Sequence, residues 1–261
     1  MPKEKLNGII YNNNPKIDRF IFICGLHRSG TTLLERLLVS KFELSCLRAS
    51  VPESEGQHMQ NVYSAGKEFG GVGRFALNAE MQHELDTLTD YKRHFSDIMA
   101  RWNNFIVGSS NVLIEKSPPN LTKIGWLRRV FNNAKFLILT RDPRAVSAAT
   151  QKMAKTQTSL PEMMLNWNAA YSLAKKDFMC SDCYYVKYED ICESTDIILD
   201  NIASFANIEY RKHELPLESR FCNITNTNNK YITMHASNYY GDAVWNELGY
   251  CIATPDPEYS K

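Results

Sequence analysis

The stretch "FIFICGLHRSGTTLLERLL", residues 20–38, has the outline of a phosphate-binding loop, because Gly25 to Gly30 spells Gly-x-x-x-x-Gly. A loop that binds a nucleoside triphosphate continues with Lys and then Ser or Thr, but here Thr31 and Thr32 follow. Backbone N–H groups of residues 28–32 would surround an anion, assisted by the positive end of a helix dipole. A ligand with a single 5′-phosphate that carries one transferable group has no γ-phosphate for a lysine to reach. We therefore expect a phosphate site in which Arg28, Thr31 and Thr32 suffice and no bridging Mg²⁺ is needed.

A second basic position stands in "LILTRDPRAVSAAT", where Arg141 follows an apolar run. The planar guanidinium fork suits a phosphate group. Ser147 and Thr150, in the early turns of the helix expected next, offer hydroxyl groups to the same anion. The alternative is that Arg141 and Asp142 form a surface ion pair or a helix cap.

Four short apolar runs read as buried strands, and each is followed by a helical pattern. The strands are expected at 20–24, 111–115, 135–140 and 183–188. The helices are expected from near residue 30, at 121–131, from Pro143 to about residue 155, at 161–179 and at 195–206. This alternation predicts an α/β fold, a single P-loop-like three-layer domain with a mostly parallel central sheet flanked by helices. Ligands of such sheets bind beyond the carboxyl ends of the strands. The polar clusters at 25–32, 116–120 and 141–144 fall at those ends.

The chain divides into a polar, flexible N-terminal leader, residues 1–17, and one domain, residues 18–261. Within the domain, an insert at about 47–104 is expected to shape the substrate site. It is irregular over 47–78, where glycines are frequent, and helical over 79–104 with a break near 89–90. The tail from residue 216 is expected to be irregular until a short amphipathic helix in "DAVWNELGY".

Composition narrows the classes of partner. Thirty basic and 29 acidic residues among 261 give a net charge of +1, whereas a nucleic-acid binder usually has a basic excess. The N-terminus has no apolar signal region and no apolar run is long enough for a membrane span. Seven irregularly spaced cysteines argue against a disulfide framework and favour a reducing compartment, so we expect a cytoplasmic protein. Cys180 and Cys183 are interpreted as structural rather than as a zinc or redox motif.

Five motifs in register resemble sulfotransferases that use 3′-phosphoadenosine-5′-phosphosulfate (PAPS). They are "GLHRSGTTLLERLL", "IEKSPPNL", "FLILTRDPRAVS", "YVKYEDI" and the terminal W-N-E-L-G-Y, and together they span roughly residues 20–250. The chain is most similar to bacterial-type members with a "VPE-x-EGQH-x-Q-x-VY" segment and a "GG-x-GRF" loop, here at 51–63 and 70–75. The resemblance implies sulfuryl transfer from PAPS to an acceptor hydroxyl or amine by in-line displacement with a general base, without a required metal.

The resemblance also implies which residues bind the donor. Arg28, Ser29, Gly30, Thr31 and Thr32 would hold the 5′-phosphosulfate, with His27 directly before them in the predicted donor site. Arg141 would hold the 3′-phosphate. The family serine eight residues after this arginine is Ala149 here, so Thr150 or Ser147 takes its place in the prediction. Lys230, in "NNKY", is the candidate for a basic residue of the C-terminal segment.

Lys116 matches a family lysine that contacts the leaving oxygen, and a fixed ammonium there stabilises the negative charge that grows in transfer. A plain ion pair of Lys116 with Glu115 or an exposed acid is the alternative. The acceptor hydroxyl needs a general base within hydrogen-bond reach. Some relatives carry a glutamate near positions 48–49, where this chain has Arg48 and Ala49. Glu55 is the favoured base, then Glu53, and His58 is the third candidate.

Two other readings stay open. A P-loop kinase or nucleotide triphosphatase would need the lysine that Thr31 replaces and an acidic Mg²⁺ ligand that Asp142 imitates poorly. A non-catalytic relative would keep the fold to bind a nucleotide or a partner. The acceptor class is open among tyrosyl peptide, carbohydrate, lipid, and small phenol or alcohol.

Overall fold

The computed structural model describes residues 15–154, 158–235 and 240–252 of the chain. A six-stranded sheet forms its centre, in the order β3-β2-β4-β1-β5-β6. The strands are β1 (Arg19–Cys24), β2 (Ser45–Leu47), β3 (Ile106–Val107), β4 (Val112–Lys116), β5 (Ala134–Thr140) and β6 (Cys183–Lys187). All neighbouring strands pair in parallel except β2 and β3. The predicted mostly parallel α/β sheet is confirmed, and β2 and β3 were not anticipated.

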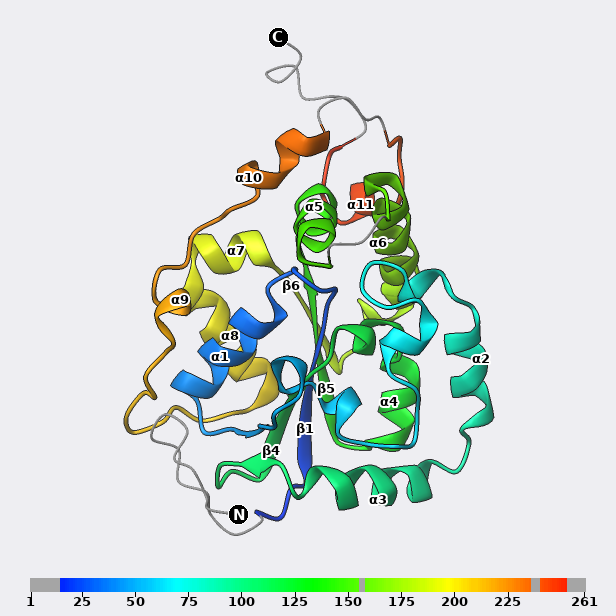
Figure 1. The fold of residues 1–261 in the computed structure, drawn as a ribbon. Helices are drawn as coiled ribbons and strands as arrows, with labels where there is room; N and C mark the ends of the chain where they lie inside the picture. Colours follow the sequence, from blue (N-terminus) through cyan, green and yellow to red (C-terminus); the bar gives the residue numbers. More distant parts are fainter. Residues whose placement is uncertain (1–14, 155–157, 236–239, 253–261) are drawn as a thin grey trace.

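Helices cover both faces of the sheet, as Figure 1 shows. On one face, α1 (Thr31–Lys41) and α8 (Thr195–Ala206) pack over Ile21 and Ile23. On the other, α3 (Tyr91–Trp102), α4 (Ile124–Val130) and α6 (Leu160–Ala174) pack over Phe20 and Phe22. Successive side chains of a strand point to opposite faces, so the apolar run of β1 feeds both cores. This gives the three layers that the sequence predicts.

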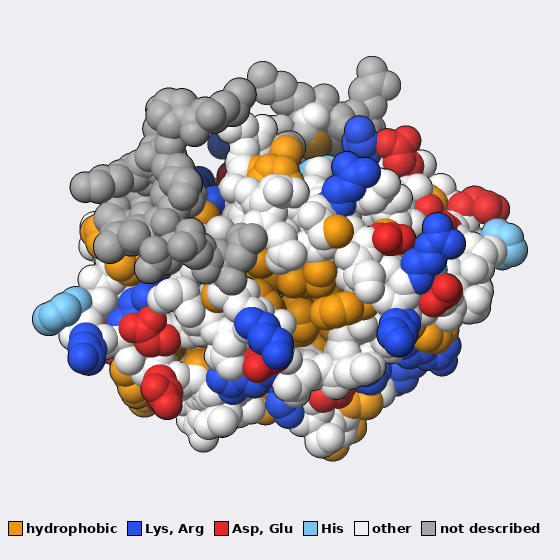
Figure 2. Space-filling view, turned by 90° about the horizontal axis from the view of Figure 1, so that it is seen from below, with side chains coloured by type: hydrophobic (Ala, Val, Ile, Leu, Met, Phe, Trp, Pro, Cys, Tyr) orange, Lys and Arg blue, Asp and Glu red, His pale blue; other side chains and the backbone are white. Residues whose placement is uncertain are grey.

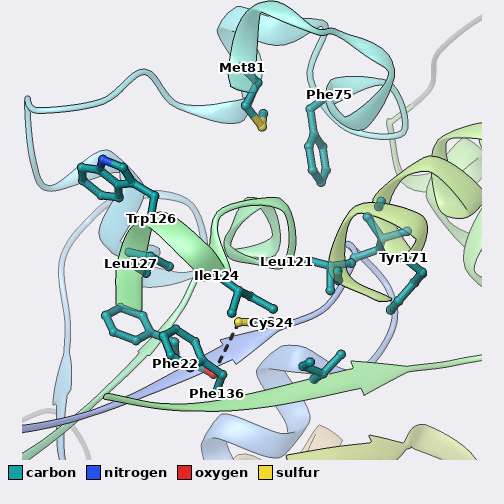
Figure 3. Close-up of a cluster of buried hydrophobic side chains, with 14 of the residues drawn as sticks. Phe22, Cys24, Phe75, Met81, Leu121, Ile124, Trp126, Leu127, Phe136 and Tyr171 are labelled. Atoms are coloured by element: carbon teal, nitrogen blue, oxygen red, sulfur yellow. Dashed lines mark hydrogen bonds between the residues drawn. The ribbon is translucent and has the colours of Figure 1, made fainter. Parts of the chain in front are cut away.

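Figure 3 shows the second core, with Phe22 and Phe136 of the sheet below the α4 side chains Ile124 and Leu127. Phe22 and Phe136 stack with ring centroids 5.6 Å apart. Phe75 and Met81, from the 47–104 region, point into the same core from above and are fully buried. This region is therefore packed on the sheet layer, although its role in shaping a substrate site stays a prediction.

The 47–104 region is built from four 3₁₀ turns followed by α2 (Glu80–Thr87) and α3. The expected helix break near 89–90 is confirmed, because α2 ends at Thr87 and Asp90 caps α3 by accepting from the Arg93 N–H. The turns occupy Pro52–Ser54, Gly56–His58, Gly66–Phe69 and Phe75–Leu77. They hold the chain close to the carboxyl end of β4.

The remaining helices surround the carboxyl edge. The helix α5 (Pro143–Ala154) follows β5, and α7 (Tyr188–Glu193) follows β6. The tail carries α9 (Ser219–Cys222), α10 (Asn229–Ile232) and α11 (Val244–Glu247), so it is less irregular than its sequence suggests. In Figure 1 the tail passes α9, runs upward past α7 and reaches α10 near the end of α5. The predicted leader, 1–17, falls outside the described residues up to residue 14.

The face seen from below, where α3 lies in Figure 1, shows basic and acidic side chains intermixed around an apolar area (Figure 2). All seven cysteines are described, and each is a free thiol. Within the described ranges, no helix is both long and apolar enough to cross a membrane.

Candidate active site

A cavity of about 330 Å³ lies at the carboxyl edge of the sheet. Segments that are distant in sequence line it, among them the loop before α1 with the first turn of that helix, the turn that holds Glu53 and Glu55, the residues that follow β5 and β6, and the tail from Arg220 to Thr227. The parallel strands bring these segments together because their carboxyl ends meet at one edge.

The loop between β1 and α1 forms one wall of the cavity. Arg28 adopts a left-handed φ of 66°, and Gly30 one of 103°. A Cβ on Gly30 would lie 2.8 Å from the Tyr188 ring, so position 30 requires glycine for space and for conformation. Ser29 is fully buried, and its hydroxyl donates to the Leu26 carbonyl at 2.6 Å. Ser29 therefore shapes the loop through its side chain.

Helix α1 begins at Thr31 and offers its first-turn N–H groups to this wall. The first intrahelical bond runs from the Leu34 N–H to the Gly30 carbonyl. The N–H groups of Thr31 and Thr32 therefore have no intrahelical acceptor, and the positive end of the helix dipole adds to them. No side chain caps the helix at Gly30. Backbone donors facing a cavity in this way suit an anion.

Arg141 also lines the cavity, beside the loop, and is 6% exposed. Its Nε donates to Asn228 Oδ1 at 2.8 Å, its Nη1 to the Arg28 carbonyl at 2.8 Å, and its Nη2 to Thr227 Oγ1 at 3.0 Å. The guanidinium lies 4.2 Å from the centre of the Tyr188 ring. Burial lowers the pKa of Arg141 from its usual value. Among the described residues it forms no direct ion pair, although the Glu189 carboxylate, linked to it through Asn228, attracts it.

Lys116 and Glu55 form a buried ion pair next to the same cavity. Lys116 Nζ lies 3.4 Å from Glu55 Oε1 and 3.3 Å from the Glu53 carbonyl oxygen. Glu55 lines the cavity directly. The plain alternative for Lys116, a pair with Glu115 or an exposed acid, is replaced by a pair with a buried carboxylate at the site. The sequence-predicted base and the sequence-predicted leaving-group cation are therefore in contact.

Three side chains hold the turn that presents Glu55. Gln57 donates to Glu55 Oε2 at 2.6 Å and accepts from the Gly66 N–H at 2.9 Å. Glu115 accepts from the Gly56 N–H at 2.9 Å, and the Trp102 indole donates to the Gly56 carbonyl at 3.1 Å. Burial raises the pKa of Glu115 from its usual value, although three hydrogen bonds oppose this shift. The turn that presents the Glu55 carboxylate is therefore held by hydrogen bonds from buried side chains.

The other two base candidates are placed differently. Glu53 lines the cavity, but its side chain is 48% exposed and lies 3.8 Å from Arg220. His58 Nε2 lies 3.8 Å from Glu55 Oε2, and burial lowers the His58 pKa from its usual value. His58 thus contacts the candidate base and is not itself part of the cavity wall described above.

The remaining predicted residues lie at other places. Ser147 and Thr150 line a separate small cavity of about 10 Å³, together with His27, which also borders the large cavity. Burial lowers the His27 pKa to about 3, so the imidazole is neutral. Lys230 lies exposed on α10. Their contacts with a donor stay predictions, as does the consequence of the buried Ala149.

Arg48 accounts for the missing acid near positions 48–49. Its guanidinium donates to Glu35 Oε1 at 2.7 Å, and Glu35 lies on α1. Arg48 thus joins β2 to α1 instead of entering the cavity wall.

Sequence reasoning missed the cavity residues of the tail, above all Thr227 and Arg220, and it missed Asn228, which contacts Arg141 behind them. Asn228 accepts from Arg141 and donates to Glu189 Oε1 at 2.6 Å. Glu189 also accepts from the Asp142 N–H at 2.9 Å and from the Tyr250 hydroxyl at 3.0 Å. The tail segment "CNITNTNNK" carries no motif. The one feature that points to a site is the frequency of amide and hydroxyl side chains in it, which could contact the buried Arg141.

No group of three or more His, Cys, Asp or Glu within the described part of the chain is arranged to hold a metal ion. The groups at the cavity include the cations Arg28 and Arg141, the free N–H groups of the first turn of α1, and the buried Glu55 carboxylate beside Lys116. Such a set of groups suits an anionic ligand.

A mostly parallel sheet with a glycine-rich loop between β1 and α1 defines the P-loop-like class of fold. The model of the sulfotransferase family matches residues 20–212, so the chain belongs to the sulfotransferase family. Protein-tyrosine sulfotransferase A of Caenorhabditis elegans is 25% identical over 206 residues, which cover 73% of this chain and 50% of that protein. Protein-tyrosine sulfotransferase 2 of Gallus gallus is 25% identical over 200 residues, 73% of this chain and 51% of that protein. The chain thus spans about half the length of these relatives.

Among solved structures, the sulfotransferase domain of the Synechococcus PCC 7002 olefin synthase is similar, with a TM-score of 0.50. The two are 19% identical, and the match covers 87% of this chain and 86% of that domain. This likeness shows a shared fold.

Proposed function

We propose that the protein transfers a sulfuryl group from PAPS to an acceptor hydroxyl. The observation that carries the proposal is one cavity lined by the first turn of α1 and by Arg141, next to the Lys116–Glu55 pair. Membership of the sulfotransferase family supports the reaction class. The buried Arg141, with no direct ion pair in the described residues, fits a phosphate group of the donor.

The proposed roles follow from the positions of the side chains. Bound PAPS would supply a sulfuryl group, whose transfer forms a bond from sulfur to the acceptor oxygen and breaks its bond to the bridging phosphate oxygen. Glu55 takes the proton of the acceptor hydroxyl. Lys116, whose attraction to Glu55 weakens once that carboxylate is protonated, stabilises the negative charge on the leaving oxygen.

The tyrosyl phenol is the first acceptor to test, because the relatives above are named as protein-tyrosine sulfotransferases. Carbohydrates, lipids and small phenols or alcohols form the comparison set. The location in the cell stays a prediction, with seven free thiols in support of a reducing compartment.

The test has two parts. Calorimetry with adenosine 3′,5′-bisphosphate measures donor-site binding, and labelled PAPS with the acceptor set measures transfer. We expect binding in the absence of Mg²⁺ and transfer to at least one hydroxyl class. A folded protein that does not bind the bisphosphate, or that hydrolyses ATP in a Mg²⁺-dependent manner at the rate of a kinase, would contradict the proposal.

A further inference from the structure

Arg141 is held in place by the tail of the chain as well as by the phosphate loop. Residues 225–228, here called the 225–228 segment, dock on the ends of β5 and β6. The Tyr188 hydroxyl donates to the Thr225 carbonyl at 3.0 Å, and Asn228 bridges Glu189 and Arg141. These contacts fix the 225–228 segment over the guanidinium without neutralising it.

Thr227 differs from the other residues of this segment, because its hydroxyl meets Arg141 and it also lines the 330 Å³ cavity. A hydroxyl has one proton to donate and two lone pairs that accept. Arg141 Nη2 occupies one lone pair of Thr227 Oγ1, which leaves the proton for a second partner. The nearby Tyr188 hydroxyl interacts with Thr227 and gives its own proton to Thr225. A phosphate oxygen is a stronger acceptor than a phenol, because charged hydrogen bonds are roughly twice as strong as neutral ones.

The hydroxyls of helix α5 do not reach the same place. Ser147 and Thr150 line the small cavity beside His27, where Thr150 donates to the His27 carbonyl at 3.4 Å. Position 149 is an alanine. Helix α5 therefore presents no hydroxyl to the cavity wall at Arg141.

We infer that Thr227 determines specificity for the nucleotide. Its hydroxyl donates a hydrogen bond to the phosphate group that Arg141 binds. The inference rests on the proposed function, in which that group is the 3′-phosphate of the donor. Recognition of this phosphate is thereby moved from helix α5 to the tail of the chain.

The test compares two nucleotides that differ only in the relevant group, adenosine 3′,5′-bisphosphate and adenosine 5′-phosphate. Calorimetry measures both dissociation constants for the wild type, Thr227→Val, Thr227→Ser and Ser147→Ala. The exposed Thr87→Val on α2 is the matched control. We expect Thr227→Val to reduce the preference for the bisphosphate about tenfold, as for loss of one hydrogen bond to a charged group. Thr227→Ser, which keeps the hydroxyl, and Thr87→Val should retain the wild-type preference.

Each failure has its own signature. If the wild type does not prefer the bisphosphate, the proposed function is contradicted and the inference with it. If the wild type prefers it and Thr227→Val prefers it equally, the inference alone is overturned. A selective loss in Ser147→Ala with Thr227→Val unaffected assigns the hydroxyl to α5 and also overturns it.

Discussion

The ammonium of Lys116 lies 3.4 Å from the carboxylate of Glu55, and both side chains are less than one-tenth exposed. Lys116 ends β4, whereas Glu55 lies in a turn of the 47–104 region. The contact therefore ties the carboxyl edge of the sheet to the region that precedes α2. It also brings together the two residues that have opposite roles in the proposed transfer.

Replacement of Glu55 by glutamine is expected to remove the base and keep the fold. The amide has the shape of the carboxylate and retains one acceptor for Lys116. Turnover should fall by about 10²–10⁴-fold, the usual contribution of a general base, while the dissociation constant of adenosine 3′,5′-bisphosphate stays near that of the wild type. Glu53→Gln is the matched variant, since its backbone carbonyl still meets Lys116. A larger loss in Glu53→Gln than in Glu55→Gln would make Glu53 the base.

Replacement of Lys116 by methionine should impair both catalysis and stability. It removes a cation that stabilises leaving-group charge, and the loss of such a group typically lowers turnover by about 10²–10³-fold. It also leaves Glu55 as a buried charge without its partner, which destabilises by about 3–5 kcal/mol. Urea unfolding and single-turnover kinetics measure the two effects.

The double variant Lys116→Met with Glu55→Gln provides the control for this stability loss. Without the carboxylate charge, it should be more stable than Lys116→Met alone. Equal stabilities of the single and double variants would show that the pair does not interact energetically.

Gly56→Ala should disturb the support of Glu55. An added Cβ would lie 2.7 Å from Glu115 Oε1 and 2.9 Å from Trp102 Cζ2, both buried groups. We expect lower stability and lower turnover with little change in nucleotide binding. Gly125→Ala on α4 is the matched control, because an added Cβ there meets nothing within 4 Å. It should stabilise the protein by about 0.5–1 kcal/mol. Wild-type turnover in Gly56→Ala would exclude this support from the mechanism.

Lys123 should make stability depend on pH in the alkaline range. Burial lowers its pKa from 10.5 to about 7, against the attraction of Glu84 and Glu115. Between these two values the unfolded chain binds more protons at this residue than the folded one, so its contribution makes stability rise with pH. The slope is at most about 1.4 kcal/mol per pH unit.

Lys123→Met isolates this effect. The free energy of unfolding from urea titrations at pH 7 to 10 should rise with pH more steeply in the wild type than in Lys123→Met. Parallel pH profiles of the two proteins would show that the Lys123 pKa is not lowered by folding.

The parallel core of the fold was predictable because its strands are continuous apolar runs that end in glycine, proline or charged residues. The runs at β1, β4 and β5 bury side chains on both faces, which leaves a clear signal in sequence, whereas the edge strand β6 is only partly buried. Strands β2 and β3 have three and two residues. Such short segments carry no periodicity, and they are strands because β2 pairs with the edge of β4 and β3 pairs with β2.

For the site, the sequence predicted which motifs gather at the sheet edge but could not predict contacts through the tail. Arg141 follows a strand and is found by its position, whereas Thr227 meets it only because the 225–228 segment docks on Tyr188 and Glu189. Ser147 and Thr150 stand close to Arg141 in sequence, yet the rotation of α5 turns them toward His27. Closeness in sequence therefore does not predict which hydroxyl contacts Arg141, because the direction of a side chain on a helix depends on how that helix is packed.

The family match ends at residue 212, while one wall of the cavity comes from residues 220–227. A fragment cut at that boundary would strip Arg141 of two of its three acceptors and Glu189 of the amide and phenol that bind it. For the proposed function we therefore expect the shortest working unit to extend to Tyr250, because a border drawn from family similarity alone would leave Arg141 without these anchors.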